Sequence, residues 1–167
     1  MNRSRISADT FYPAPGLRST HTQSLINSSG FRRRIVRKRS KALLDAEQDW
    51  ILDGGDGVRL LGHYSPQTNG SKGLVILFHG WEGSSRSNYI VAAGGMLYDR
   101  GFDVFRLNFR DHGESHHMNR GLFHSCRLAE VVHALQDIQT RTGAKDWALS
   151  GYSLGGNFAL RCAIEAP

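Results

Sequence analysis

The sequence predicts an α/β protein built on a doubly wound, mostly parallel sheet. Two observations lead to this prediction: apolar runs of strand length alternate with runs of helical periodicity, and residues 74–78 form a continuous apolar run typical of a strand buried on both faces. A strand, a helix and a second strand in this order make a parallel unit. In such sheets, ligands bind at the carboxyl ends of the strands.

The expected elements alternate along the chain. Strands are expected at residues 49–52, 58–64, 74–78, 102–107 and 147–149. The first two form a hairpin around the glycine-rich turn at residues 54–57. Apolar side chains recur at helical spacing at two sets of positions: Tyr89, Ala93, Met96 and Leu97 before Gly101, and Leu128, Val131, Val132, Leu135 and Ile138 before Gly143. A third helix is expected over residues 156–164.

The composition is that of a globular protein. The 167 residues have the length of one domain, and with 40% hydrophobic and 22% charged residues they can bury a core. No apolar run approaches the length of a membrane span, and residues 1–6 lack the apolar core of a signal peptide. Cys126 and Cys162 fall in helical patterns, which favours reduced, packed thiols over a disulfide. We therefore expect a cytoplasmic protein without a transmembrane segment.

Residues 1–48 are polar and basic and are expected to form an arm before a domain at residues 49–167. One stretch of the arm holds seven of the 21 basic residues and no acid: Arg32, Arg33, Arg34, Arg37, Lys38, Arg39 and Lys41. Such a run can bind nucleic acid or an anionic lipid surface. Because no aromatic interleaving or nucleic-acid module accompanies it, we favour a solvated arm that makes a weak contact with an anionic surface and binds no specific nucleic acid.

The segment Gly151-Tyr152-Ser153-Leu154-Gly155 lies between the last expected strand and the last expected helix. A strand that runs into Gly-x-Ser-x-Gly is how a class of hydrolases exposes a serine nucleophile, so Ser153 is the candidate nucleophile. The glycines are needed because a Cβ would collide with the sharp turn. The pentapeptide alone is a weak signal, and its position between a strand and a helix strengthens it.

Acyl transfer also needs hydrogen-bond donors for the oxyanion, and backbone N–H groups supply them in this kind of site. Leu154 follows the nucleophile at the start of a helix. Trp81 lies in the loop at residues 79–85, which leaves the strand at residues 74–78 through His79-Gly80. We expect Trp81 and Leu154 to be the two donors, because a glycine-containing loop after a strand can turn its N–H groups inward.

Two segments with histidines allow other interpretations. His79 is expected to brace the oxyanion loop, because the catalytic histidine of such hydrolases follows the last strand. The segment 111–117 places His112 and His116 four residues apart, as some zinc sites do. That spacing needs a helix to bring the two rings together, and Gly113 argues against one. We expect a polar loop near the mouth of the site, with no metal and no cofactor.

Several segments together resemble the YheT-like branch of the α/β-hydrolases, and the resemblance spans most of the chain: residues 11–17, His21-Thr22-Gln23, residues 79–85, Asn108-Phe109-Arg110, Phe123-His124-Ser125 and residues 151–157. The resemblance implies an α/β-hydrolase fold and hydrolysis of carboxylic esters, either small-molecule or lipid esters, through a Ser-Asp-His triad. Ser153 would be its serine, with Trp81 and Leu154 as oxyanion donors.

The resemblance leaves the substrate open. Tyr152 and Glu82 are expected to contact it, since they adjoin the nucleophile and the second donor. The loop at residues 111–115 follows the general hydrolase style, and Cys126 stands where a glycine is commoner in the family. Both departures affect loop shape, so acyl and alcohol specificity do not follow from the motifs. The oligomeric state does not follow either.

The resemblance also implies further strands that carry the acid and then the histidine of the triad. Neither follows Ser153 here, so residues 49–167 are interpreted as the N-terminal portion of an α/β-hydrolase domain, truncated after the nucleophile helix. By themselves these residues are expected to be essentially inactive on esters, because an unassisted hydroxyl is a poor nucleophile. Two alternatives stay open: a non-catalytic module that binds an anionic partner through the basic arm, and an acyltransferase.

Overall fold

The computed structural model describes residues 12–165. Phe11, with which the family resemblance begins, and residues 1–6 lie outside this range. The chain divides into two compact units, residues 1–35 and 36–167, and each is described by itself. The described residues form five strands: β1 (Gln48–Asp53), β2 (Arg59–Ser65), β3 (Leu74–Phe78), β4 (Asp103–Leu107) and β5 (Trp147–Gly151). They also form six helices: α1 (Thr20–Ser28), α2 (Gly30–Arg39), α3 (Lys41–Asp45), α4 (Asn88–Tyr98), α5 (Leu128–Thr142) and α6 (Leu154–Glu165).

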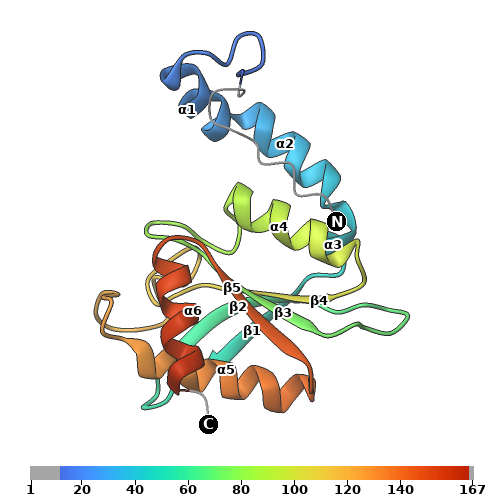
Figure 1. The fold of residues 1–167 in the computed structure, drawn as a ribbon. Helices are drawn as coiled ribbons and strands as arrows, with labels where there is room; N and C mark the ends of the chain where they lie inside the picture. The colour runs from blue at the N-terminus through green and yellow to red at the C-terminus, as the bar shows by residue number, and fades with distance from the viewer. Residues whose placement is uncertain (1–11, 166–167) are drawn as a thin grey trace. The chain divides into compact units, whose positions relative to one another are not determined.

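The strands form one sheet in the order β1-β2-β4-β3-β5 (Figure 1). β2 is antiparallel to both of its neighbours, so it alone runs against the other four strands. β3 is parallel to β4 and β5, with Phe78 level with Leu107 and Gly151. The predicted fold class, an α/β protein with a mostly parallel sheet, is therefore confirmed. This register also brings the segments after β3, β4 and β5 together at one edge of the sheet.

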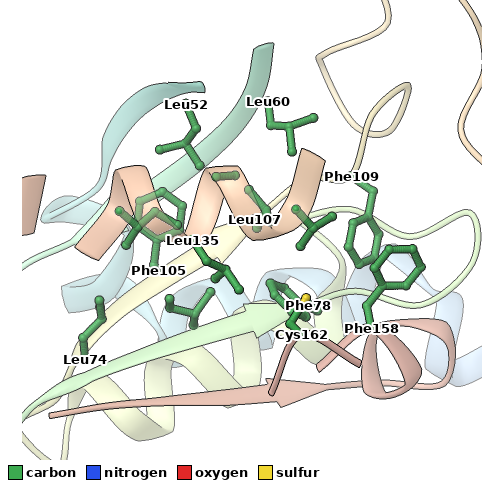
Figure 2. Packing of buried hydrophobic residues seen from close by; sticks show 14 of the residues in the cluster. Leu52, Leu60, Leu74, Phe78, Phe105, Leu107, Phe109, Leu135, Phe158 and Cys162 are labelled. Atoms are coloured by element: carbon green, nitrogen blue, oxygen red, sulfur yellow. The ribbon is translucent and has the colours of Figure 1, made fainter. Parts of the chain in front are cut away.

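The two faces of the sheet are covered by different helices. Figure 1 shows α4 on one face and α5 and α6 on the other. Alternate residues of β3 accordingly enter different cores. Leu74, Ile76 and Phe78 pack in the larger core, which α5 and α6 cover, whereas Val75 and Leu77 pack in the smaller core. Figure 2 shows the larger core, where side chains from β1, β2, β3, β4, α5 and α6 meet.

The expected buried face of α4 is wrong in part. Tyr89 and Met96 are exposed, and the buried positions include Gly94 and Gly95. A Cβ on Gly95 would lie 2.3 Å from Ser40 Oγ, so the helix meets its neighbour through its glycines. Apolar spacing overlooks such a face because a glycine carries no apolar side chain.

The basic segment contains helices that the sequence left undetermined. In the second unit, α3 packs against α4 through Leu43, which is fully buried, and Ser40 Oγ donates a hydrogen bond to Val91 O at 3.0 Å. The expected boundary between arm and domain at residue 48 stays a prediction. Among the helices of residues 12–165, none is long and apolar enough to cross a membrane.

The two cysteines differ from each other. Both are free thiols. Cys162 lies in α6 and is buried in the larger core, as its helical pattern predicted. Cys126 is exposed and precedes α5, so its assignment to a helix and to a packed environment is wrong. Cys126 lies in a turn, and the helix begins only at Leu128.

Candidate active site

The turn between β5 and α6 has a backbone that only glycines on both sides of Ser153 permit. Ser153 has φ of +52°, in the left-handed region. A Cβ on Gly151 would lie 2.2 Å from the carbonyl of Gly155, and a Cβ on Gly155 would lie 2.5 Å from the carbonyl oxygens of Phe78 and His79. These contacts are with backbone atoms, which no change of rotamer can relieve. The exposed Ser153 side chain is thus held out from a tight turn.

The loop that follows β3 lies against this turn. Tyr152 N–H donates to Phe78 O at 3.1 Å. A Cβ on Gly80 would lie 3.2 Å from Tyr152 O and 3.5 Å from Ser153 Cβ. Gly80 is therefore in contact with the serine. The register of β3 and β5 explains this proximity, because both strands end at the same level of the sheet.

Two backbone N–H groups next to these contacts have no protein acceptor. Within residues 12–165, neither Trp81 N–H nor Leu154 N–H donates to another residue. For Leu154 the reason is its place at the first position of α6, where the helix provides no acceptor. Trp81 follows Gly80 in the loop. Among the described residues, neither N–H group is used by another part of the protein.

His79 uses both ring nitrogens within its own surroundings. Its side chain is fully buried. Phe109 N–H donates to Nε2 at 3.1 Å, so Nε2 is an acceptor and the proton is on Nδ1, which donates to Gly80 O at 2.8 Å. Burial lowers the pKa of His79 from its usual value near 6.5 to about 4. His79 is thus a neutral imidazole that joins the start of the loop to the segment after β4.

The sequence analysis missed two further supports of this loop. Tyr89 Oη accepts a hydrogen bond from Gly80 N–H at 3.0 Å, and Asn108 Oδ1 accepts one from Ser85 N–H at 2.8 Å. Asn108 follows β4 directly, and a polar residue at the carboxyl end of a parallel strand is the signal that could have identified it. The helical spacing predicts Tyr89 in the core face of its helix, which gives its hydroxyl no role.

A hollow of about 380 Å³ opens beside the loop. Its lining combines aromatic and polar side chains: Trp81, Glu82, Gly83, Asp111, His112, Gly113, His116, Leu122 and Phe123. The Trp81 and Phe123 rings lie 6.2 Å apart, and 62% of Trp81 is exposed. Glu82 and Asp111 have φ of +54° and +58°. Of the two residues expected to contact substrate, Glu82 lines the hollow, whereas Tyr152 packs against Tyr89 outside it.

The segment 111–117 is irregular, so it offers no helix to bring its histidines together. His116 Nδ1 lies 2.7 Å from Asp111 Oδ1. One other group of the described residues has the composition of a metal site, Glu47 with Asp49 and His63. The Glu47 carboxylate there already lies against two guanidinium groups, which compensate its charge. That arrangement suits a buried ion-pair network better than a cation.

No histidine or carboxylate among residues 12–165 is hydrogen-bonded to Ser153 Oγ. His112 Nδ1 instead lies 2.8 Å from Arg110 O. The described part of the chain therefore brings together a serine, a glycine-rich turn and the start of the loop after β3. It does not bring a base to the serine.

The chain is similar in sequence to a known protein family and to a bacterial protein. Residues 73–167 match the family described as alpha/beta hydrolase fold. The chain is 30% identical over 159 residues to YheT of Escherichia coli (strain K12), a protein whose name provisionally calls it an esterase. The match covers 95% of this chain and 44% of YheT. The chain therefore spans less than half the length of that relative.

Solved structures share the fold. An esterase of Pyrococcus furiosus superposes with a TM-score of 0.64 at 23% identity, over 72% of this chain and 45% of the esterase. A serine hydrolase without a lid from Xanthomonas campestris superposes with a TM-score of 0.60 at 21% identity, over 71% of this chain and 56% of that enzyme. At such identities the likeness establishes the fold alone.

Proposed function

Because the chain belongs to the α/β-hydrolase fold family, we propose that the full protein is a serine hydrolase of carboxylic esters with Ser153 as its nucleophile. The substrates are small-molecule or lipid esters. The observation that supports this best is the left-handed backbone of Ser153 in contact with Gly80. Such a backbone costs about 1–3 kcal/mol in a non-glycine residue, and strain of this kind gathers at functional sites. The printed names of YheT and of the Pyrococcus enzyme agree with this chemistry.

In the proposed reaction, Ser153 Oγ attacks the ester carbonyl while a general base takes the hydroxyl proton. The carbonyl oxygen becomes an oxyanion, to which Trp81 N–H and Leu154 N–H donate. Leu154 adds the partial positive charge of the α6 N-terminus. The alcohol then leaves with the proton, and water hydrolyses the acyl-enzyme.

The remaining roles are proposed from the contacts around the serine. His79 braces the donor loop and is not the base, because both of its ring nitrogens are already hydrogen-bonded. Gly80, Gly151 and Gly155 permit the close approach of loop and turn. We assign the acid and the base to residues outside 12–165, in keeping with the greater length of YheT. Glu82 contacts the substrate from the hollow, and Tyr152 contacts it from the turn.

The test is activity-based labelling of the full protein with a fluorophosphonate probe, together with a nitrophenyl ester assay. Ser153→Ala is expected to abolish labelling and to lower kcat at least about 10⁴-fold. Ser150→Ala is the matched control, because Ser150 is an exposed serine three residues earlier in β5 and should leave both readouts unchanged. Labelling and turnover that survive Ser153→Ala would reject the proposal. Transfer of the acyl group to an added alcohol in preference to water would identify an acyltransferase.

A second function, contact with an anionic lipid surface, is supported by the surface of α2. Phe31 is 73% exposed and Ile35 is 38% exposed. They are four residues apart, so they lie on one side of the helix. The other side chains of α2 are mostly cationic, and residues 12–44 contain no acid. Exposed apolar residues flanked by arginines are typical of helices that lie in a membrane interface.

Sedimentation with vesicles tests this contact. The protein is expected to bind vesicles of phosphatidylserine and phosphatidylcholine and not those of phosphatidylcholine alone. Each basic side chain at the surface should contribute about 1 kcal/mol to the free energy of binding. Joint replacement of Arg33, Arg34 and Arg37 by Gln should abolish binding, whereas the same change at three other exposed basic residues should not: Arg100, Arg120 and Lys145. Binding that persists without the three arginines, or that occurs only with RNA, would contradict it.

A further inference from the structure

The far end of the loop after β3 is held by a buried arginine. Arg106 lies on β4 and is fully buried. Its Nη1 donates a hydrogen bond to Ser85 O at 3.2 Å, and its Nη2 contacts Glu47 Oε2. One guanidinium thus joins the segment before β1 to Ser85, the last residue of the loop at residues 79–85.

The backbone N–H and the backbone carbonyl of Ser85 are each hydrogen-bonded to a side chain. Asn108 Oδ1 accepts the Ser85 N–H at 2.8 Å, and Arg106 donates to the Ser85 carbonyl. Both side chains come from β4 and the residue that follows it. Arg86, the residue after the loop, places its Nη1 2.9 Å from Glu47 Oε1. Glu47 therefore holds the two arginines together.

The charges in this cluster depend on one another. Burial raises the pKa of Glu47, but the interactions with its charged neighbours, chiefly the Arg106 guanidinium, together lower it by more, so the pKa lies below its usual value. Burial lowers the pKa of Arg106, and Glu47 opposes that shift. His63 lies beside the same carboxylate, 3.6 Å from Oε1, and burial lowers its pKa, so a neutral ring stands there at neutral pH. The ion pair of Glu47 and Arg106 is the charged centre of the cluster.

Stability alone does not account for a buried pair of this kind. Desolvating two charges costs about as much as their attraction returns, and apolar side chains of the same volume would often serve as well. An apolar side chain at position 106 could not donate to Ser85 O. A lysine could keep the charge beside Glu47, but its single ammonium group does not present two diverging donors as the planar guanidinium does.

We propose that Arg106, held in place by Glu47, is a positioning residue that sets the path of the donor loop and thereby the direction of Trp81 N–H. The inference rests on the proposed hydrolase function. Between Ser85 and Trp81 the loop contains one further turn, in which Gly83 N–H donates to Gly80 O at 3.0 Å, so a shift at Ser85 is passed along a short, connected backbone. Arg106 touches no reacting atom and acts through this backbone alone.

The direct test is Arg106→Lys in the full protein. We expect kcat to fall about tenfold with KM within about twofold, which is smaller than the roughly 10²–10³ lost with a whole oxyanion donor. Amide hydrogen exchange should speed up in residues 81–85 and not in β3. Arg100→Lys is the matched control, since Arg100 is exposed and its side chain donates to Met96 O, away from the donor loop, so it should change neither readout.

A second variant, Glu47→Gln, covers the case in which Arg106→Lys does not fold. It keeps the shape of the side chain and removes the charge that holds Arg106, and we expect the same faster exchange in residues 81–85 with an unchanged KM. Unchanged kcat and unchanged exchange in folded variants would overturn the inference, as would a fall in melting temperature with normal turnover. If the unmodified protein has no esterase activity, the proposed function fails, while the exchange of residues 81–85 still decides whether Arg106 positions the loop.

Discussion

The turn after β5 and the loop after β3 lie in contact at one edge of the sheet, yet they are held in different ways. The turn is formed within five residues, where Gly151 and Gly155 bring backbone against backbone. The loop is held by side chains from other segments, among them Asn108 and Arg106. The turn depends on glycines, which have no Cβ. The loop depends on polar side chains from distant parts of the sequence.

The two regions should therefore fail differently. An added methyl group in the turn meets backbone atoms, which cannot move without displacing β3 or α6. A lost hydrogen bond in the loop removes one support of several, and the others remain. Substitutions in the turn are expected to act on the whole domain, and substitutions in the loop are expected to act on the position of its donors.

The largest effect is expected for Gly155→Ala. The new Cβ would lie 2.5 Å from the carbonyl oxygens of Phe78 and His79, so we expect a loss of about 3 kcal/mol or more in the free energy of unfolding and loss of turnover. Gly156→Ala is the matched control. Its Cβ would approach Gly151 O at 3.2 Å, and the helix propensity of Ala returns about 1 kcal/mol. Urea unfolding measures both, and equal losses in the two variants would contradict the explanation.

The next effect concerns pH and His79. Its folded pKa of about 4 lies below the unfolded value near 6.5, so the unfolded state binds more protons in this interval and stability falls as pH drops from 6.5 to 4. The loss from this group is at most about 3 kcal/mol. His79→Gln should remove that part of the decrease in the free energy of unfolding between pH 7 and pH 4.5, measured by urea unfolding. His124→Gln, at an exposed histidine, should retain it. An equal decrease in all three proteins would show that His79 does not titrate as described.

The same contrast explains what could be predicted from the sequence. The α/β fold and the family followed from local patterns, and both are confirmed. The turn at Ser153 was visible because an apolar run, two glycines and a serine stand side by side. The contact of Arg106 with Glu47 was not visible, because 59 positions separate the two residues and neither lies in a motif. Asn108 belongs to a segment that resembles the family, but its hydrogen bond with Ser85 can be recognised only in the fold.

A smaller effect is expected for Asn108→Ala. The Ser85 N–H then loses its acceptor in a buried environment, which costs about 1–3 kcal/mol. Turnover should fall as well, because the end of the loop is released on one side. Asn157→Ala is the control for stability, since Asn157 is exposed on α6 and should have little effect. If thermal unfolding of Asn108→Ala matches that of the unmodified protein, water replaces the side chain without cost and the support is weaker than the hydrogen bond suggests.

The smallest effect is expected for Tyr89→Phe, which removes only the acceptor of Gly80 N–H. Because Tyr89 is 38% exposed, water can take the place of its hydroxyl, and we expect a loss below about 1 kcal/mol in stability. The rate should respond more than the stability, since Gly80 adjoins both Ser153 and the Trp81 donor, and a fewfold fall in kcat is expected. Tyr98→Phe is the matched control, because Tyr98 lies on the same helix and its hydroxyl donates to Pro66 O at 3.0 Å, outside the donor loop. A fall in kcat that is equal in both variants would mean that the hydrogen bond from Gly80 N–H to Tyr89 does not set the start of the loop.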